Sequence, residues 1–415
     1  MLKMVETFSG IGAQAKALRN IKIDYEILNT ADWDVNAILA YDYVHNGKPK
    51  KSKYDAMDKN ELVKILSKYT LSLDGKSPAS HRQIEVQNVE LLRRLCYSIE
   101  RTNNLISVTD IKGEELPNEM NILTYSFPCQ DLSLAGCWHG NNSGIDRNAN
   151  NRSSMLWQIE RILLERKNKN LSMPRFLLME NVRNIMSKKH ETNFKMWQDS
   201  LGNMGYKNYV FALNAVNFGI PQKRVRAYMV SILTNGDEEL NDRLDNYFKE
   251  NNLTRVKSPN ELGKKMKKMS SILKIDYSNP IYKSEAEESQ PRDTVSRRQI
   301  YNDNEKLFHN GSFAVIAPTL TTKQDRHPNS GVIDYINNKK NMSKFRYLTP
   351  REGFLLMGFD EIDFDRIVNN NFVNFRGNKF FTRDKLNKMA GNSIVVNVLE
   401  EIFKQIDYID KNFFD

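Results

Sequence analysis

The chain has 415 residues, with 61 lysines and arginines against 51 acidic residues, giving a formal net charge of +10. A hydrophobic content of 40% argues against a wholly disordered chain, and the length allows two or three domains. The three cysteines are too few for a disulfide scaffold, and the chain shows neither a secretory signal nor a membrane span, so we expect a cytoplasmic protein. The basic charge favours a polyanionic partner without establishing one.

The first part of the chain predicts the start of a parallel α/β sheet. A short strand at 4–8 leads into a glycine-rich turn at 9–12 and a helix at 13–20, and a second strand is expected at 25–31. In such sheets, ligands bind at the carboxyl ends of the strands. Residues 45–102, with a basic run and an amphipathic pattern, are predicted to be an insertion.

Further along the chain, the sheet pattern resumes and then stops. Strands are expected at 107–111, 122–127, 176–179 and 228–232, and a helix at 153–167. After residue 233 the chain becomes rich in Lys, Ser and Asn and loses its apolar periodicity, which predicts a domain boundary. A turn at 391–393 is followed by an amphipathic helical pattern.

The turn at 9–12 is the first candidate site. A Gly-x-Gly after a strand lets the backbone approach a nucleotide-like ligand. Asp32 lies about twenty residues further on, where a carboxylate can accept hydrogen bonds from ribose hydroxyls. Trp33 could stack on a purine, and Glu6 at the strand end would suit an ammonium group. This turn alone leaves NAD, S-adenosylmethionine and a plain tight turn all open.

Cys129 follows directly on a predicted buried strand, which would place its thiol at the mouth of a ligand cleft. A catalytic thiol needs positive charge nearby to favour the thiolate, and Arg224 and Arg226 are candidates for that charge. The alternative is a structural cysteine, which applies more strongly to Cys96 and Cys137 because neither follows a strand.

Two more polar groups flank predicted strands. Partial burial of Glu180 would raise its pKa and allow proton exchange near neutrality, although the residue could equally be a helix N-terminal carboxylate. Gln222, Arg224 and Arg226 alternate along the chain, which predicts a shared polar face. A solvated surface is the alternative for these three.

Taken together, the motifs resemble those of the DNA cytosine-5 methyltransferases, particularly the bacterial restriction-modification type. The motifs occur in order as FSGIG at 8–12, PCQ at 128–130, ENV at 180–182, QKRVR at 222–226, RYLTPRE at 346–352 and GNS at 391–393. The chain departs from the commoner family pattern with Thr-Phe-Ser at 7–9 and with Asp32 in place of a glutamate.

The resemblance implies an α/β fold, a Rossmann-like mixed sheet of the S-adenosylmethionine-dependent methyltransferases with a smaller target-recognition domain. It implies a catalytic and cofactor-binding domain at 1–232, a target-recognition domain at 233–379, and a C-terminal helix at 380–415 that completes the catalytic domain.

The resemblance also implies a covalent mechanism on a cytosine flipped out of duplex DNA. The Cys129 thiolate would add to ring carbon C6, so that C5 becomes nucleophilic toward the methyl group. Glu180 would protonate or hydrogen-bond N3, Arg226 would hold O2, and Arg224 would help order the site. The loop after Cys129, including Arg152, would close over the base.

Other residues are implied to bind the cofactor or the DNA. The cofactor would be S-adenosylmethionine, with Trp33 packed on the adenine ring and Asp110 at its amino group. The implied cofactor-binding residues are Phe8, Gly10, Ile11, Gly12, Asp32, Trp33, Asp110, Ile111, Asn392 and Ser393. The implied DNA-contacting residues are Pro128, Gln130, Arg152, Asn181, Gln222 and Thr319. Lysines of the recognition region could contact phosphates without reading sequence: Lys264, Lys265, Lys267 and Lys268.

We therefore expect double-stranded DNA as the partner, a monomeric protein, no metal and no membrane, with a cognate restriction endonuclease as a possible functional companion. Three alternatives remain: a tRNA cytosine-5 methyltransferase, a catalytically silent DNA-binding regulator on the same fold, and a nicotinamide dehydrogenase built on the same turn.

Overall fold

The computed structural model describes residues 1–128, 132, 144–147, 152–324, 328–337, 339–374 and 377–414. Its contacts divide the chain into two units. Unit 1 comprises Met1–Leu213, Val225–Arg255 and Glu400–Asp415, and unit 2 comprises Asn214–Arg224 and Val256–Leu399. These units change at positions other than the predicted boundaries after 232 and 379, and the assignment of domains to catalysis and DNA recognition stays a prediction.

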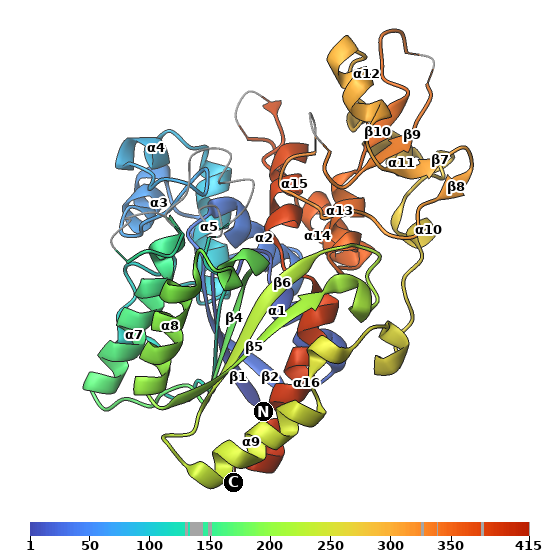
Figure 1. Ribbon diagram of the computed structural model, residues 1–415. Coiled ribbons are helices and arrows are strands. Elements are labelled where there is room, and N and C mark those ends of the chain that lie inside the picture. Colours follow the sequence, from blue (N-terminus) through green and yellow to red (C-terminus); the bar gives the residue numbers. More distant parts are fainter. Residues whose placement is uncertain are drawn as a thin grey trace. The chain divides into compact units, whose positions relative to one another are not determined.

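Unit 1 is built on a six-stranded sheet with the order β2-β1-β3-β4-β6-β5 (Figure 1). β2, β1, β3 and β4 are parallel, whereas β6 runs antiparallel to β4. The sheet is therefore mixed and mostly parallel, as the sequence predicted. The strands are β1 (Leu2–Thr7), β2 (Tyr25–Ala31), β3 (Ile122–Tyr125), β4 (Phe176–Val182), β5 (Tyr206–Asn214) and β6 (Val225–Leu233).

Helices cover both faces of this sheet, because its central strands are apolar on both sides. α7 and α8 cover one face, where the Trp197 indole donates to the Tyr125 hydroxyl (3.2 Å) and packs edge-on against Trp157. α1 and α2 cover the other face, where Tyr41 contacts Glu6 of β1. The helices of unit 1 are α1 (Ala13–Ile21), α2 (Val35–Asn46), α3 (Lys59–Leu66), α4 (His81–Glu85), α5 (Val89–Arg101), α7 (Leu156–Asn168), α8 (Glu191–Asn203) and α9 (Glu238–Glu250).

Residues 45–102 contribute α3, α4 and α5 to unit 1. α5 packs against α2 and α3, and it buries Leu91, Leu92 and Leu95, which agrees with the amphipathic pattern noted in the sequence of this region.

The strand expected at 107–111 is wrong. Residues 107–110 form a turn in which the Asp110 amide donates to the Ser107 carbonyl (2.9 Å), and Ile106 has a left-handed φ of 65°. The contacts with β2 come before this segment, at the isolated bridge between Thr30 and Asn104 and at the Leu105 amide, which donates to the Thr30 carbonyl (2.8 Å).

The helix α9 and the strand β5 were not predicted. α9 buries Leu240, Leu244 and Phe248, whose spacing follows one helical face. β5 lies at the end of the sheet order, where one edge of a strand has no neighbour, so its polar residues are compatible with its position. The predicted helix at 153–167 begins instead at Leu156, after a 3-10 turn at Arg152–Met155.

Unit 2 contains a four-stranded sheet with the order β10-β9-β7-β8 and several short helices. Its strands are β7 (Lys306–His309), β8 (Ser312–Phe313), β9 (Val332–Asp334) and β10 (Phe345–Tyr347). Its helices are α10 (Met269–Ile272), α11 (Pro280–Glu288), α12 (Val295–Asn302), α13 (Pro350–Leu356), α14 (Glu361–Asn369) and α15 (Arg383–Asn392). α16 (Val396–Phe413) begins in unit 2, and its residues from Glu400 onward belong to unit 1.

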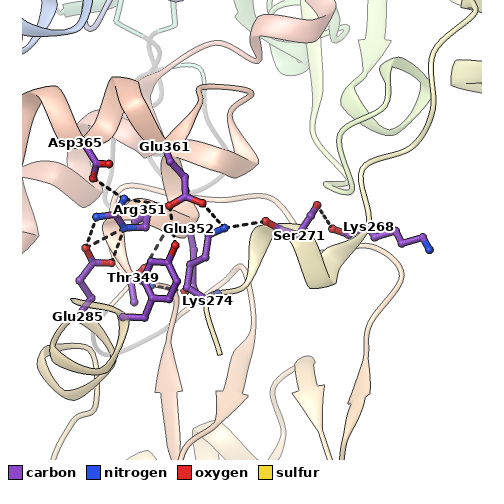
Figure 2. A network of polar contacts seen from close by, with 10 residues as sticks. Lys268, Ser271, Lys274, Glu285, Thr349, Arg351, Glu352, Glu361 and Asp365 are labelled. Carbon is purple, nitrogen blue, oxygen red and sulfur yellow. Dashed lines mark hydrogen bonds and ion pairs between the residues drawn. The ribbon is translucent and has the colours of Figure 1, made fainter. Parts of the chain in front are cut away.

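The motif at 346–352 forms the start of α13 and a polar network around it (Figure 2). Thr349 caps the helix, and the Glu352 carboxylate accepts the Thr349 amide (2.8 Å) in a capping box. The guanidinium of Arg346 donates two hydrogen bonds of 2.8 Å to the same carboxylate. Figure 2 also shows Arg351 between Glu285 and Asp365, with Nε–Oε1 at 3.0 Å and Nη1–Oδ1 at 2.7 Å.

Candidate functional site

The strand register brings the residues that follow β1, β2 and β3, and one residue of β4, to one edge of the sheet in unit 1. Thr7 pairs with Ala31 on one side and Tyr125 on the other, and Tyr125 pairs with Met179. These strands are parallel, so the residue after each of these positions comes at the same edge. This row consists of Asp32, Phe8, Ser126 and Glu180.

The glycine-rich turn has a backbone that only glycine tolerates at its second glycine. Gly10 and Gly12 have φ of 54° and 78°, in the left-handed region, and Phe8 has a φ of 52°. A Cβ on Gly12 would lie 2.1 Å from Nε2 of His45, a residue of α2 that also contacts the Ile11 carbonyl oxygen through Nε2 (3.2 Å). A Cβ on Gly10 would meet nothing within 4 Å, so its backbone borders open space.

Asp32, whose carboxylate is predicted to accept hydrogen bonds from ribose hydroxyls, is held beside this turn. Asp32 accepts the Gly10 amide at Oδ2 (2.9 Å) and the Asp34 amide at Oδ1 (2.9 Å). Its own amide donates to Oδ1 of Asn104 (3.2 Å). The structure thus brings Gly10 and Asp32 into direct contact, with the half-buried Trp33 next in the chain.

Glu6 does not face a ligand, contrary to the sequence interpretation. Its side chain is fully buried, and Oε2 accepts the Tyr41 hydroxyl (2.9 Å). Burial raises the pKa of this carboxyl to about 8. Glu6 is therefore a core residue that links β1 to α2.

The other predicted cofactor residues of unit 1 differ in exposure. Asp110 is exposed, and its carboxylate accepts the Thr109 hydroxyl (3.0 Å). Ile111 is buried in the hydrophobic core. Asp110 can therefore meet a ligand with its side chain, whereas Ile111 is 2% exposed and packs in the core.

The ends of β4 and β6 place the predicted acid and the predicted arginine together. Val182 of β4 pairs with Arg226 of β6, and Nε of Arg226 lies 3.5 Å from Oε1 of Glu180. The two side chains are 17% and 12% exposed, so the ion pair is largely shielded but still open to a ligand.

The backbone that leads to Cys129 is anchored beside this pair. Asn181 donates from Nδ2 to the Phe127 carbonyl (3.1 Å), and the Ser153 hydroxyl donates to the Pro128 carbonyl (2.8 Å). Cys129 and Gln130 lie outside the described residues, as does the side chain of Arg152. The motif did not indicate Ser153, because its contact comes from a segment distant in the sequence.

The other cysteines fit the structural alternative where they can be compared. Cys96 is buried in α5, and burial raises the pKa of its thiol to about 12. Such a thiol is unreactive near neutral pH. Cys137 lies outside the described residues.

Several predicted residues belong to unit 2, where they hold its segments together. Arg224 donates to the carbonyl oxygens of Leu320 (2.8 Å), Gly391 (3.2 Å) and Ser393 (2.9 Å). The backbone of the predicted cofactor residue Ser393 is thus fixed by Arg224, and Asn392 precedes it at the end of α15.

Gln222 and Thr319 belong to the same junction in unit 2. Nε2 of Gln222 donates to the Leu356 carbonyl (2.8 Å), and its Oε1 accepts the Leu320 amide (2.9 Å). The Thr319 hydroxyl donates to the Lys223 carbonyl (2.6 Å). The prediction of one polar face shared with Arg226 is wrong, because β6 begins only at Val225 and the preceding residues bind unit 2 backbone.

Within the described ranges, no group of three or more His, Cys, Asp or Glu side chains could hold a metal ion. No helix in the described part of the chain is both long and apolar enough to cross a membrane.

Comparisons with known proteins agree on one family. The family model described as C-5 cytosine-specific DNA methylase matches residues 91–408. The orphan methyltransferase M.SssI of Spiroplasma monobiae is 33% identical over 98% of this chain and 97% of its own length. The type II methyltransferase M2.ScrFI of Lactococcus lactis subsp. cremoris is 28% identical over 98% and 99%. Among solved structures, the Dnmt2 methyltransferase of S. pombe shares the fold, with a TM-score of 0.58 at 17% identity and full coverage of both chains.

Proposed function

Because the chain belongs to the C-5 cytosine-specific DNA methylase family, we propose that Cys129, Glu180 and Arg226 carry its reaction on a cytosine of duplex DNA. Members of this family methylate C5 of cytosine through a covalent cysteine adduct. The observation that supports the proposal is the row at the sheet edge, in which Glu180 is paired with Arg226 beside the anchored backbone leading to Cys129.

Each of these residues has a distinct proposed task. The Cys129 thiolate adds to C6 of the flipped base, which pushes electron density toward N3 and O2 of the ring. Glu180 supplies a proton or hydrogen bond at N3, and Arg226 donates to O2, so charge does not accumulate on the ring. Their ion pair holds both groups in place before the base arrives. The proposed task of Arg224 is structural, because it fixes the backbone of Leu320, Gly391 and Ser393 within unit 2.

The residues around the turn fit S-adenosylmethionine, the methyl donor of this family. When bound, this cofactor supplies an electrophilic methyl group. We propose that Asp32 accepts hydrogen bonds from the ribose hydroxyls, that Trp33 packs on the adenine, and that the backbone of Gly10 borders the ligand. The fit rests on the open space at Gly10 and on the fixed carboxylate of Asp32. Phe8, Ile11, Gly12, Asp110, Ile111, Asn392 and Ser393 complete the proposed set.

We further propose that the protein acts as a monomer on a short specific sequence, with unit 2 contributing recognition. One relative is named an orphan methyltransferase and the other a type II methyltransferase. Both arrangements, with and without a companion endonuclease, are therefore compatible with this chain. DNA affinity should fall steeply with salt, because phosphate contacts release counterions.

A trapping experiment tests the proposal without knowledge of the target sequence. Long duplex DNA is synthesised with 5-fluorocytosine in place of every cytosine, so it contains any short target. Incubation with the protein and S-adenosylmethionine should give an adduct that survives denaturing electrophoresis, because fluorine at C5 prevents the final elimination. Cys129→Ala should give none.

A second arm addresses the RNA alternative. Tritiated methyl transfer is compared between duplex DNA and tRNA, and label in DNA alone is expected. Label confined to tRNA would reverse the choice of substrate, and an adduct with the Cys129→Ala protein would remove Cys129 from the mechanism.

A further inference from the structure

Residues 71–79 form a short segment that pairs with the backbone around Trp33. The Ser72 amide donates to the Trp33 carbonyl (2.8 Å), and the Val35 amide donates to the Ser72 carbonyl (3.0 Å). Ser72 and Asp34 thus form a parallel bridge, and Ser72 is fully buried. The contact is long-range, since nearly forty residues separate its two sides.

The segment is closed on itself by side chains. The Ser72 hydroxyl donates to the Ser77 carbonyl (2.7 Å) and accepts the Gly75 amide (2.9 Å). Oδ1 of Asp74 accepts the amides of Lys76 (2.8 Å) and Ser77 (3.0 Å). These bonds fix the turn at 74–77, so the backbone of Ser72 is presented to Trp33 in one conformation.

The two neighbours of Trp33 in the chain are also joined to each other, and one of them, Asp32, contacts the glycine-rich turn. The Asp34 amide donates to Oδ1 of Asp32, and the Gly10 amide donates to Oδ2 of the same residue. The backbone around Trp33 is therefore held by Asp32 and by the segment 71–79. A backbone that is fixed before binding limits the positions open to its side chain, so less conformational freedom is lost when a planar ligand packs on the ring.

We propose that the segment 71–79 positions Trp33 for the adenine of the cofactor, with Ser72 and Asp74 as positioning residues. This inference rests on the proposed function, which places Trp33 at the cofactor site. It gives part of the region 45–102 a task in cofactor binding, in addition to its helical packing.

The test measures cofactor affinity by isothermal titration calorimetry on the full chain. Asp74→Ala removes the acceptor that closes the turn and should raise the Kd for S-adenosylmethionine about 3- to 10-fold, the worth of a typical hydrogen bond. The KM for DNA and kcat at saturating cofactor should change little. Asp74→Asn keeps an Oδ1 acceptor and should restore the wild-type Kd.

A matched control separates positioning from general loosening of this region. Asp58 also closes a local turn in the region 45–102, by accepting the Glu61 amide at the start of α3 (2.9 Å). Asp58→Ala should lower the stability of this region but leave the Kd for the cofactor unchanged. An equal rise in Kd for Asp58→Ala and Asp74→Ala would overturn the inference.

A double-variant cycle links the effect to Trp33 itself. In a Trp33→Ala background, Asp74→Ala should have no further effect on the Kd, whereas additive effects would contradict the inference. If Trp33→Ala alone leaves the Kd unchanged, the proposed cofactor site is wrong at this residue. If Trp33→Ala weakens binding and Asp74→Ala does not, only the role of the segment 71–79 fails.

Discussion

Arg224 and Arg226 belong to one sequence motif, yet they lie in different units and have different partners. Arg224 in unit 2 is buried and donates to three backbone carbonyls. Arg226 in unit 1 lies at the start of β6, partly exposed beside the Glu180 carboxylate. Backbone carbonyls are fixed acceptors that no reaction changes, whereas a carboxylate at a sheet edge can exchange protons with a ligand.

The same contrast recurs between the polar clusters of the two units. In unit 2, Arg346 and Glu352 form an ion pair, and both side chains are fully buried. In unit 1, the pair of Glu180 and Arg226 keeps an exposed side. Residue type alone therefore does not indicate catalysis, and accessibility of the polar atoms decides between the structural and the chemical interpretation.

The largest expected effects test directly whether the two arginines have different roles. Arg226→Ala should lower kcat about 100- to 1000-fold, as for other lost donors to a developing negative charge, with little change in the free energy of unfolding. Arg224→Ala should instead lower the free energy of unfolding by about 3 kcal/mol or more, because buried carbonyls lose their donor. Steady-state kinetics and urea unfolding of both variants check this. The reverse assignment of losses would refute the comparison.

A second prediction compares a buried ion pair with a partly exposed ion pair within unit 2. Glu352→Gln leaves the buried Arg346 without its counter-charge and should destabilise the protein by about 3–5 kcal/mol. The control is Asp365→Asn, which weakens the contact of Arg351 with a 43% exposed carboxylate and should cost no more than about 1 kcal/mol. Denaturant midpoints measure both. Similar losses for the two variants would show that burial does not distinguish these ion pairs.

A third prediction concerns the pH dependence of stability that the buried carboxyl of Glu6 introduces. Its pKa is about 8 in the folded protein against an ordinary value of 4.5, so the folded state holds a proton that the unfolded state has released. This contribution to stability is complete below the ordinary pKa and is lost as the pH rises toward about 8, by at most about 1.4 kcal/mol per pH unit.

The check is the pH dependence of urea unfolding in the wild type and in Glu6→Gln. The variant cannot titrate at this position, so its stability should fall less between about pH 5 and about pH 8. Parallel pH profiles for the two proteins would mean that Glu6 keeps its ordinary pKa.

Elements with a strong local pattern were predictable from the sequence. The strand expected at 25–31 is β2 (Tyr25–Ala31), and the turn, the following helix and the strand before Cys129 occur where expected. The family and its chemistry followed from the order of the motifs. The roles of the individual residues in that chemistry are proposals.

What the sequence could not predict depends on contacts between distant segments. Asn104, His45 and Ser72 contact Asp32, the glycine-rich turn and Trp33 respectively, but each is far from its partner in the chain. The segment 107–111 has the composition of a strand, yet local turn bonds compete successfully with sheet pairing. The one available signal was Gly12, whose missing side chain indicates that another group approaches closely.

The passage of α16 into unit 1 has a consequence for biosynthesis. Residues 400–415 are translated after all of unit 2, yet Asn20 donates to Glu400 (2.7 Å) and Gln405 donates to the Asn251 carbonyl (2.6 Å). The ribosome must therefore translate all of unit 2 before the last segment of unit 1 is available for folding. During that interval the nascent chain exposes surface that buried residues such as Phe403 and Ile406 later cover, which makes it a candidate client for chaperones.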